Sequence, residues 1–211
     1  MTERGVLVAF EGPSGTGKST VARLVADALR PVRVLLTREP SDGPLGLEAR
    51  AGTGRYSGRA LACLVAADRY AHLEEEVVPA LAAGAVVICD RYVMSSFVLQ
   101  RLDGVEREFI SCLNAPAPRP DLYVMLAAAP SDAADRVRAR GTSSRFQPRS
   151  EEHAAAEAVL YEEEESLAAR SGQRLLRLDT TGRAPEAVAA QACVAISALV
   201  RPPTPPAPAT R

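Results

Sequence analysis

The sequence lacks the features that mark several large classes of protein. No apolar run in its 211 residues approaches the roughly 20 residues that a membrane-spanning helix needs, so we expect no membrane protein. The formal net charge of −1 offers no basic surface for duplex nucleic acid, and we expect no nucleic-acid partner. The only histidines, His72 and His153, are too few and too far apart for a metal cluster.

The cysteines also form no recognisable pattern. Cys63, Cys89, Cys112 and Cys193 lie far apart and include no C-x-x-C pair. Three of them lie in apolar stretches, where a buried free thiol is the usual state, so we expect a reducing, cytoplasmic compartment. Residues 1–5 lead directly into the first predicted strand, and no signal peptide is expected before it.

The clearest positive feature is a glycine-rich segment between a strand pattern and a helix pattern. Residues 6–10 are typical of a strand buried on both faces of a parallel sheet, and apolar residues recur at helical spacing over residues 19–29. Between them, G-P-S-G-T-G-K-S fits the phosphate-binding pattern G-x-x-x-x-G-K-[ST]. Backbone N–H groups and the helix N-terminus attract phosphate in such a loop. The residues expected to bind ATP are Gly12, Ser14, Gly15, Thr16, Gly17, Lys18, Ser19 and Thr20.

Oxygen-bearing residues near this loop are candidates for a magnesium site. Lys18 would reach the outer phosphates, and the Ser19 hydroxyl would complete a Mg²⁺ shell. Asp90 ends an apolar strand, where phosphate-loop enzymes place a metal-holding carboxylate; a helix cap is the alternative. Glu11 is a further carboxylate near the metal. The N-K-x-D motif of a GTPase is absent, which favours a kinase over a switch protein.

Strand and helix patterns alternate along the remaining chain. Further strands are predicted over residues 32–37, 85–90, 122–126 and 174–178, and helices over 59–81, 95–101, 105–113, 151–169 and 185–200. Ser131 or Asp132 is expected to cap a helix that ends near residue 140, and Pro79 is expected to kink the long helix. The glycine-rich stretch 41–58 is predicted to be a loop with at most a short helix near Leu47.

This alternation predicts an α/β fold of the P-loop NTPase type, with a five-stranded, doubly wound parallel sheet and helices on both faces. We expect a single kinase domain over residues 1–200. An arginine-bearing lid is predicted over 141–150, and a disordered proline-rich tail over 201–211.

Several segments together resemble thymidylate kinases. They are F-E-G-P-S-G-T-G-K-S-T at 10–20, T-R-E-P at 37–40, A-D-R at 67–69, D-R-Y-x-x-S-S at 90–96, Gln100, and P-D-L at 120–122. The resemblance covers roughly residues 6–200 in the family's order. T-R-E-P followed by D-R-Y-x-x-S-S is much more selective than the phosphate loop, which many families share.

The resemblance implies transfer of a phosphoryl group from ATP to the 5′-phosphate of a deoxynucleotide. Arg38 and Arg91 would bind the acceptor phosphate, Arg69 would read the base edge, and Gln100 would line the base pocket. Lys18, Arg91 and a lid arginine would stabilise the transferred phosphoryl group, whose charge spreads over its equatorial oxygens. The candidates for this lid arginine are Arg136, Arg140, Arg145 and Arg149. Of these, we expect Arg145 to be the catalytic one. The remaining acceptor-side residues are Glu11, Val65, Ser95 and Leu99. Relatives are commonly dimers, so a homodimer is expected.

The nucleoside side departs from the family pattern. Ser14 stands where relatives usually carry an acid that organises the sugar end of the acceptor. Val65 stands where a phenylalanine usually stacks on thymine, and Leu99 replaces a tyrosine. The acceptor is therefore expected to be dTMP or a related or modified pyrimidine nucleotide. Two alternatives stay open, namely a kinase of another small phosphorylated metabolite and a non-catalytic ATP-binding regulator derived from a kinase.

Overall fold

A five-stranded, all-parallel sheet lies at the centre of the computed structural model, which describes residues 4–140 and 151–200. The strand order is β2-β3-β1-β4-β5. The strands are β1 (Val6–Glu11), β2 (Val34–Arg38), β3 (Val86–Asp90), β4 (Leu122–Ala127) and β5 (Leu175–Asp179). The predicted α/β fold with a parallel sheet is thus confirmed. The predicted lid, with Arg145 and Arg149, and the predicted tail lie outside the described residues.

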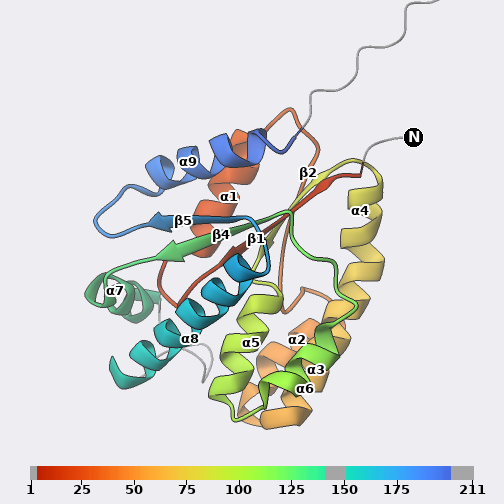
Figure 1. The fold of residues 1–211 in the computed structure, drawn as a ribbon, viewed down its shortest axis with the longest axis vertical. Coiled ribbons are helices and arrows are strands. Elements are labelled where there is room, and N and C mark those ends of the chain that lie inside the picture. The colour runs from red at the N-terminus through yellow and green to blue at the C-terminus, as the bar shows by residue number, and fades with distance from the viewer. Residues whose placement is uncertain (1–3, 141–150, 201–211) are drawn as a thin grey trace, which may run out of the picture.

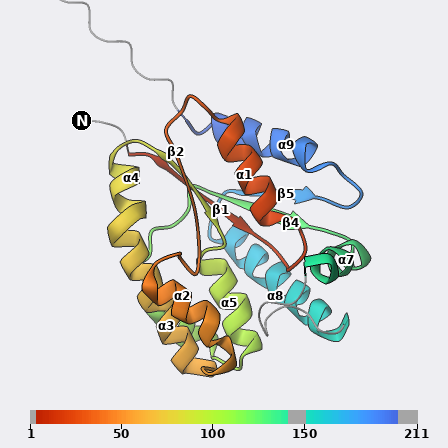
Figure 2. The ribbon, with the colours of Figure 1, turned by 180° about the vertical axis from the view of Figure 1, so that it is seen from behind.

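Successive residues of the central strands are apolar, and alternate residues of a strand point to opposite sides of the sheet. Both faces of the sheet are therefore apolar. On one face, Val8 and Phe10 join a buried cluster with α1 (Lys18–Ala28) and α9 (Pro185–Ser197), which pack side by side (Figures 1 and 2). On the other face, Leu7 and Ala9 join a second cluster that includes residues of α5 (Val93–Leu102) and α8 (Glu151–Arg170). The central strand β1 is therefore covered on both sides, as its continuous apolar sequence predicts.

The long predicted helix is interrupted by a turn of wider pitch. It comprises α3 (Gly58–His72), the π-helical η2 (Leu73–Val77) and α4 (Val78–Ala82). The N–H of Val78 donates to the carbonyl of Leu73, five residues back. Pro79 follows directly, and its ring would clash with the carbonyl of Glu75 in a regular α-turn. The wider turn accommodates the proline without ending the helix.

Of two local predictions, one is confirmed and one needs correction. The short helix allowed near Leu47 is the eight-residue α2 (Pro44–Ala51), which is followed by the 3₁₀ turn η1 (Gly52–Gly54); extended Gly43 and Pro44 provide its start. The helix α7 (Pro130–Arg140) begins one residue before Ser131, so neither Ser131 nor Asp132 caps it. Asp132 instead accepts a hydrogen bond from the N–H of Gly182 at 3.0 Å.

The cysteines are all free thiols, but they are not all buried. Cys89 is buried in β3, whereas Cys63 and Cys112 are exposed and Cys193 is partly exposed. The expected burial of the apolar-stretch cysteines therefore fails for Cys63, which is an exposed residue of α3. None of the helices in residues 4–140 and 151–200 combines the length and the apolar character that a membrane crossing needs.

Candidate nucleotide-binding site

A cavity of about 420 Å³ lies where β1, β2 and β3 end. Because the three strands are parallel and adjacent, their carboxyl ends meet at one edge of the sheet. The predicted site residues that line the cavity are Ser14, Gly15, Gly17, Lys18, Ser19, Arg38, Val65, Arg69, Asp90, Arg91, Ser95, Leu99 and Gln100. The helices α2 and α3, together with α5, form its other walls; with α6 (Arg107–Asn114) they make a group beside the sheet (Figure 1).

The phosphate loop depends on glycine at two close approaches. Gly12 and Gly15 have φ values of 135° and 86°, which side chains rarely adopt. A Cβ atom on Gly12 would lie 2.1 Å from the carbonyl oxygen of Leu126, and one on Gly15 would lie 2.3 Å from that of Ala133. The loop is therefore held tightly between the end of β4 and α7, with the N-terminus of α1 directly behind it.

Lys18 is buried against the loop that it belongs to. Its Nζ donates to the carbonyl oxygens of Gly12 and Pro13 at 2.8 and 2.7 Å. Burial, together with the positive charge of Arg91, lowers the pKa of Lys18 to about 7. A phosphate bound in the cavity would favour the ammonium form and compete with these carbonyls for it.

The Ser19 hydroxyl and the Asp90 carboxylate meet at the ends of α1 and β3. Ser19 Oγ donates a hydrogen bond to Asp90 Oδ2, whereas Asp90 Oδ1 is buried without a hydrogen-bond partner in residues 4–140 and 151–200. Hard oxygen donors and an unpaired carboxylate oxygen suit Mg²⁺. Within the described residues, no group of three or more His, Cys, Asp or Glu side chains could hold a metal. A magnesium ion here would therefore take most of its ligands from phosphates and water.

Two expected phosphate-binding arginines line the cavity from different sides. Arg91 is the only non-glycine residue with positive φ in the described chain, at 69°. Its Nη1 donates to Ser95 Oγ at 3.1 Å and to Tyr161 Oη at 2.9 Å. Arg38 is half exposed and lies 3.1 Å from a carboxylate oxygen of Asp42. The sequence analysis did not single out Arg50, which also lines the cavity.

Glu11, the carboxylate expected near the metal, lies at the end of β1 against the start of α5. It is fully buried, and its Oε1 accepts from the N–H groups of Tyr92 and Ser95 at 2.8 and 3.1 Å. Its Oε2 accepts from Ser95 Oγ at 2.5 Å. Burial raises the pKa of Glu11 to about 7, against the opposing effect of these hydrogen bonds. Glu11 thus satisfies backbone donors at the start of α5, which lack partners within the helix.

Side chains of α3 hold the segment that carries Arg38. The Asp68 carboxylate accepts from the N–H and the hydroxyl of Ser41 at 2.7 and 2.5 Å. One turn along α3, His72 Nε2 lies 2.7 Å from Thr37 Oγ1. Both ends of the T-R-E-P segment are therefore tied to one helix.

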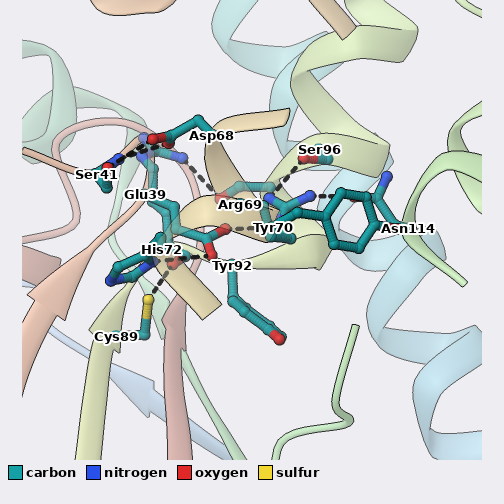
Figure 3. Close-up of polar contacts among 12 residues, drawn as sticks. Glu39, Ser41, Asp68, Arg69, Tyr70, His72, Cys89, Tyr92, Ser96 and Asn114 are labelled. Atoms are coloured by element: carbon teal, nitrogen blue, oxygen red, sulfur yellow. Dashed lines mark hydrogen bonds and ion pairs between the residues drawn. The ribbon is translucent and has the colours of Figure 1, made fainter. Parts of the chain in front are cut away.

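Arg69, expected to read the base, is held by the same network. Its Nε donates to Glu39 Oε2 at 2.6 Å, and its other nitrogens donate to Ser96 Oγ at 2.9 Å and to Asn114 Oδ1 (Figure 3). Arg69 lines the cavity although its side chain is only 2% exposed. The sequence analysis gave Glu39 and Asn114 no role of their own. The E in T-R-E-P was the available signal for Glu39, and Asn114 had none.

Of the four lid arginines, only Arg136 has a described side chain. It bonds Thr180 through both Nη atoms at 2.9 Å, and Nη1 also lies 3.4 Å from the carbonyl oxygen of Gly15. Arg136 therefore bridges the end of β5 and the phosphate loop without lining the cavity. The three other lid arginines lie outside the described side chains.

In this molecule a strand is followed by a glycine-rich loop and then by a helix, at the carboxyl edge of a parallel sheet. This arrangement is that of the P-loop nucleotide-binding proteins. The family model described as thymidylate kinase matches residues 10–190. The chain therefore belongs to the thymidylate kinase family, as its motifs suggested.

Individual relatives agree with this assignment. A probable thymidylate kinase of Pyrobaculum aerophilum is 37% identical over 197 residues, which is 92% of this chain and 97% of the relative. Thymidylate kinases of Xanthomonas campestris and Xanthomonas oryzae are 41% and 42% identical over 145 and 141 residues. These matches span 67% and 65% of this chain, and 64% and 62% of the two relatives.

Proposed function

We propose that this chain transfers the γ-phosphoryl group of ATP to the 5′-phosphate of dTMP, which yields ADP and dTDP. The observation that carries the proposal is one cavity lined by a phosphate loop, by Asp90, and by Arg38 and Arg91, in a chain of the thymidylate kinase family. Donor phosphates suit the loop, and a phosphorylated acceptor suits two guanidinium groups, which bind phosphate through bidentate, charge-assisted hydrogen bonds.

The residues of the cavity would act mainly by positioning and by electrostatics. Lys18 would exchange the loop carbonyls for phosphate oxygens, and Arg91 would hold the acceptor phosphate within reach of the donor. Ser19 and Asp90 would hold a magnesium ion, which neutralises charge on the phosphates when bound. Phosphoryl transfer needs little covalent help from the protein, because its transition state is loose and its charge is spread over oxygens.

The base end of the cavity supports a pyrimidine acceptor of modest size. Leu61, Val65 and Leu99 give this end an aliphatic wall, and the buried side-chain oxygen of Gln100 has no hydrogen-bond partner in the described part of the chain. A base N–H could donate to that oxygen. Family membership favours neither a kinase of another phosphorylated metabolite nor a non-catalytic ATP-binding regulator.

A product-resolved acceptor screen tests the proposal. Purified protein with ATP and Mg²⁺ is given dTMP, dUMP, dCMP and unphosphorylated thymidine, and the products are separated by anion exchange. We expect dTDP from dTMP, no product from thymidine, and loss of dTDP formation in Arg91→Ala. Phosphorylation of thymidine that Arg91→Ala leaves unchanged would contradict the proposed reaction.

We also propose that the chain forms a homodimer in the cytoplasm. Free thiols at all four cysteines agree with a reducing compartment. Light scattering after size exclusion measures the mass in solution, and a monomer at micromolar concentration would rule out a stable dimer.

A further inference from the structure

A buried carboxylate from α8 contacts the phosphate loop. Glu157 is 0% exposed, and its Oε1 accepts hydrogen bonds from the backbone N–H and the hydroxyl of Ser14 at 3.1 and 3.2 Å. The two residues are 143 positions apart in sequence. A charged side chain is rarely buried without partners, because burial removes its hydration. Its place in the fold therefore calls for a specific role.

The second carboxylate oxygen of Glu157 has no hydrogen-bond partner among the residues that the structure describes. In the described part of the chain, four buried side-chain oxygens or nitrogens lack one, namely Asp90 Oδ1, Gln100 Oε1, Glu157 Oε2 and Gln173 Oε1. Asp90 and Gln100 line the cavity, and Glu157 contacts it through Ser14. Its charge also lies within range of Lys18, where it opposes the lowering of the Lys18 pKa by burial. Glu157 is thus part of the electrostatic environment of the cavity.

The backbone N–H groups of the phosphate loop include one that is bonded to Glu157 and several that have no protein acceptor in the described chain. Ser14 N–H donates to Glu157, whereas the N–H groups of Gly15, Gly17, Lys18 and Ser19 donate to no group in the described chain. Those four are available for phosphate oxygens. The contact with Ser14 therefore anchors the loop immediately before its phosphate-binding amides and does not compete with them.

The same face of α8 reaches the acceptor side of the cavity. Tyr161 lies one turn after Glu157, and its hydroxyl contacts Arg91 Nη1 and Ser95 Oγ, each at 2.9 Å. Residues four apart lie on one side of a helix. One helix face therefore holds both the donor loop, through Glu157, and Arg91, through Tyr161.

We propose that Glu157 is a positioning residue for phosphoryl transfer, which holds Ser14 so that the phosphate loop is aligned with the phosphate bound at Arg91. The proposal rests on the proposed kinase function. The proposal also predicts that only one of the two positions, 14 and 157, can carry a buried carboxylate. Two carboxylates about 3 Å apart cannot both ionise without a large cost in free energy.

Steady-state kinetics with ATP and dTMP test this role. Glu157→Leu removes the acceptor of the Ser14 hydrogen bonds and is expected to lower kcat about tenfold or more, with each KM changed less than about threefold. Glu157→Gln keeps an acceptor oxygen and is expected to retain kcat within about threefold. Ser14→Asp is expected to lose at least about tenfold in kcat, and the double variant Ser14→Asp/Glu157→Gln to recover most of it, because the amide can donate to the new carboxylate.

Glu164 provides a matched control on the same helix. It is also a buried glutamate, at 4% exposure, but it pairs with Arg107 at 2.9 Å, away from the loop. Glu164→Leu is expected to lower the melting temperature and to leave kcat within about twofold. Equal loss of kcat in Glu164→Leu and Glu157→Leu would overturn the proposal, as would wild-type kcat in Glu157→Leu or a double variant no better than Ser14→Asp.

Amide exchange measured by NMR gives a readout that does not depend on activity. We expect the Ser14 amide to exchange about tenfold faster in Glu157→Leu and unchanged in Glu157→Gln. If the wild type makes no dTDP, the kinase proposal fails, while this measurement still tests whether Glu157 anchors the loop. Unchanged exchange in Glu157→Leu would overturn the anchoring itself.

Discussion

Arg69 and Glu39 form a buried ion pair, with Arg69 Nε 2.6 Å from Glu39 Oε2 and both side chains only 2% exposed. Arg69 belongs to α3 and Glu39 to the segment after β2, so the pair joins two walls of the cavity. His72 lies close to the other oxygen of Glu39, at 3.5 Å. Both charges are removed from water, and each therefore depends on the other for its stabilisation.

Glu39→Ala is expected to destabilise the fold by about 3–5 kcal/mol, because it leaves the Arg69 guanidinium buried and uncompensated. Urea unfolding followed by circular dichroism measures the change. The exposed pair between Arg59 and Glu106 provides a control, and Glu106→Ala should leave the unfolding midpoint nearly unchanged. A small effect of Glu39→Ala would mean that water reaches Arg69.

Lys18→Ala is expected to lower the rate of phosphoryl transfer at least about 100-fold while the protein stays folded, because the positive charge at the outer phosphates is lost. The buried ammonium has a lowered pKa, so its removal should not reduce the melting temperature. Activity and melting temperature are measured on the same preparations. A variant that melts like wild type and retains more than about a tenth of the activity would exclude this role for Lys18.

Glu11 should make stability depend on pH in the acidic range. Burial raises the pKa of Glu11 from 4.5 to about 7. Between these two pH values the carboxyl is therefore protonated in the folded state and ionised in the unfolded state. Its contribution to stability is present below pH 4.5 and is lost as the pH rises through about 7. Urea unfolding of wild type and Glu11→Gln between pH 5 and pH 7 should show a smaller decline in the variant. Parallel curves would show that Glu11 does not titrate there.

Val65→Phe is expected to raise kcat/KM for dTMP at least about fivefold, because stacking a base on an aromatic ring is worth about 1–3 kcal/mol. Val65 lines the cavity beside Leu61 and Leu99, which leaves the base without an aromatic partner on that wall. The KM for ATP serves as the internal control and should not change. High dTMP efficiency in the wild type, without improvement in the variant, would show that Val65 suffices for thymine.

Local patterns predicted the parts of the molecule that depend on neighbouring residues. The glycine spacing over residues 12–19 predicted the phosphate loop, because positive φ and close backbone approach leave little choice of residue. Apolar runs that end in Glu11 and Asp90 predicted buried parallel strands. Parallel strands place their carboxyl ends on one edge, so even the grouping of the cavity residues followed from the order of these elements.

Contacts between distant segments were decided only by the tertiary structure. Nothing near Glu157 in the sequence distinguishes it from the exposed glutamates of α8, yet packing buries it against Ser14. The contact of Glu11 with the start of α5 also joins distant segments, because its carboxylate accepts from the backbone N–H groups of Tyr92 and Ser95. Cys63 lies in an apolar stretch but is exposed, because the other elements of the chain do not cover that part of α3. Periodicity determines which helix face is apolar, whereas the partner that covers this face depends on how all the elements pack together.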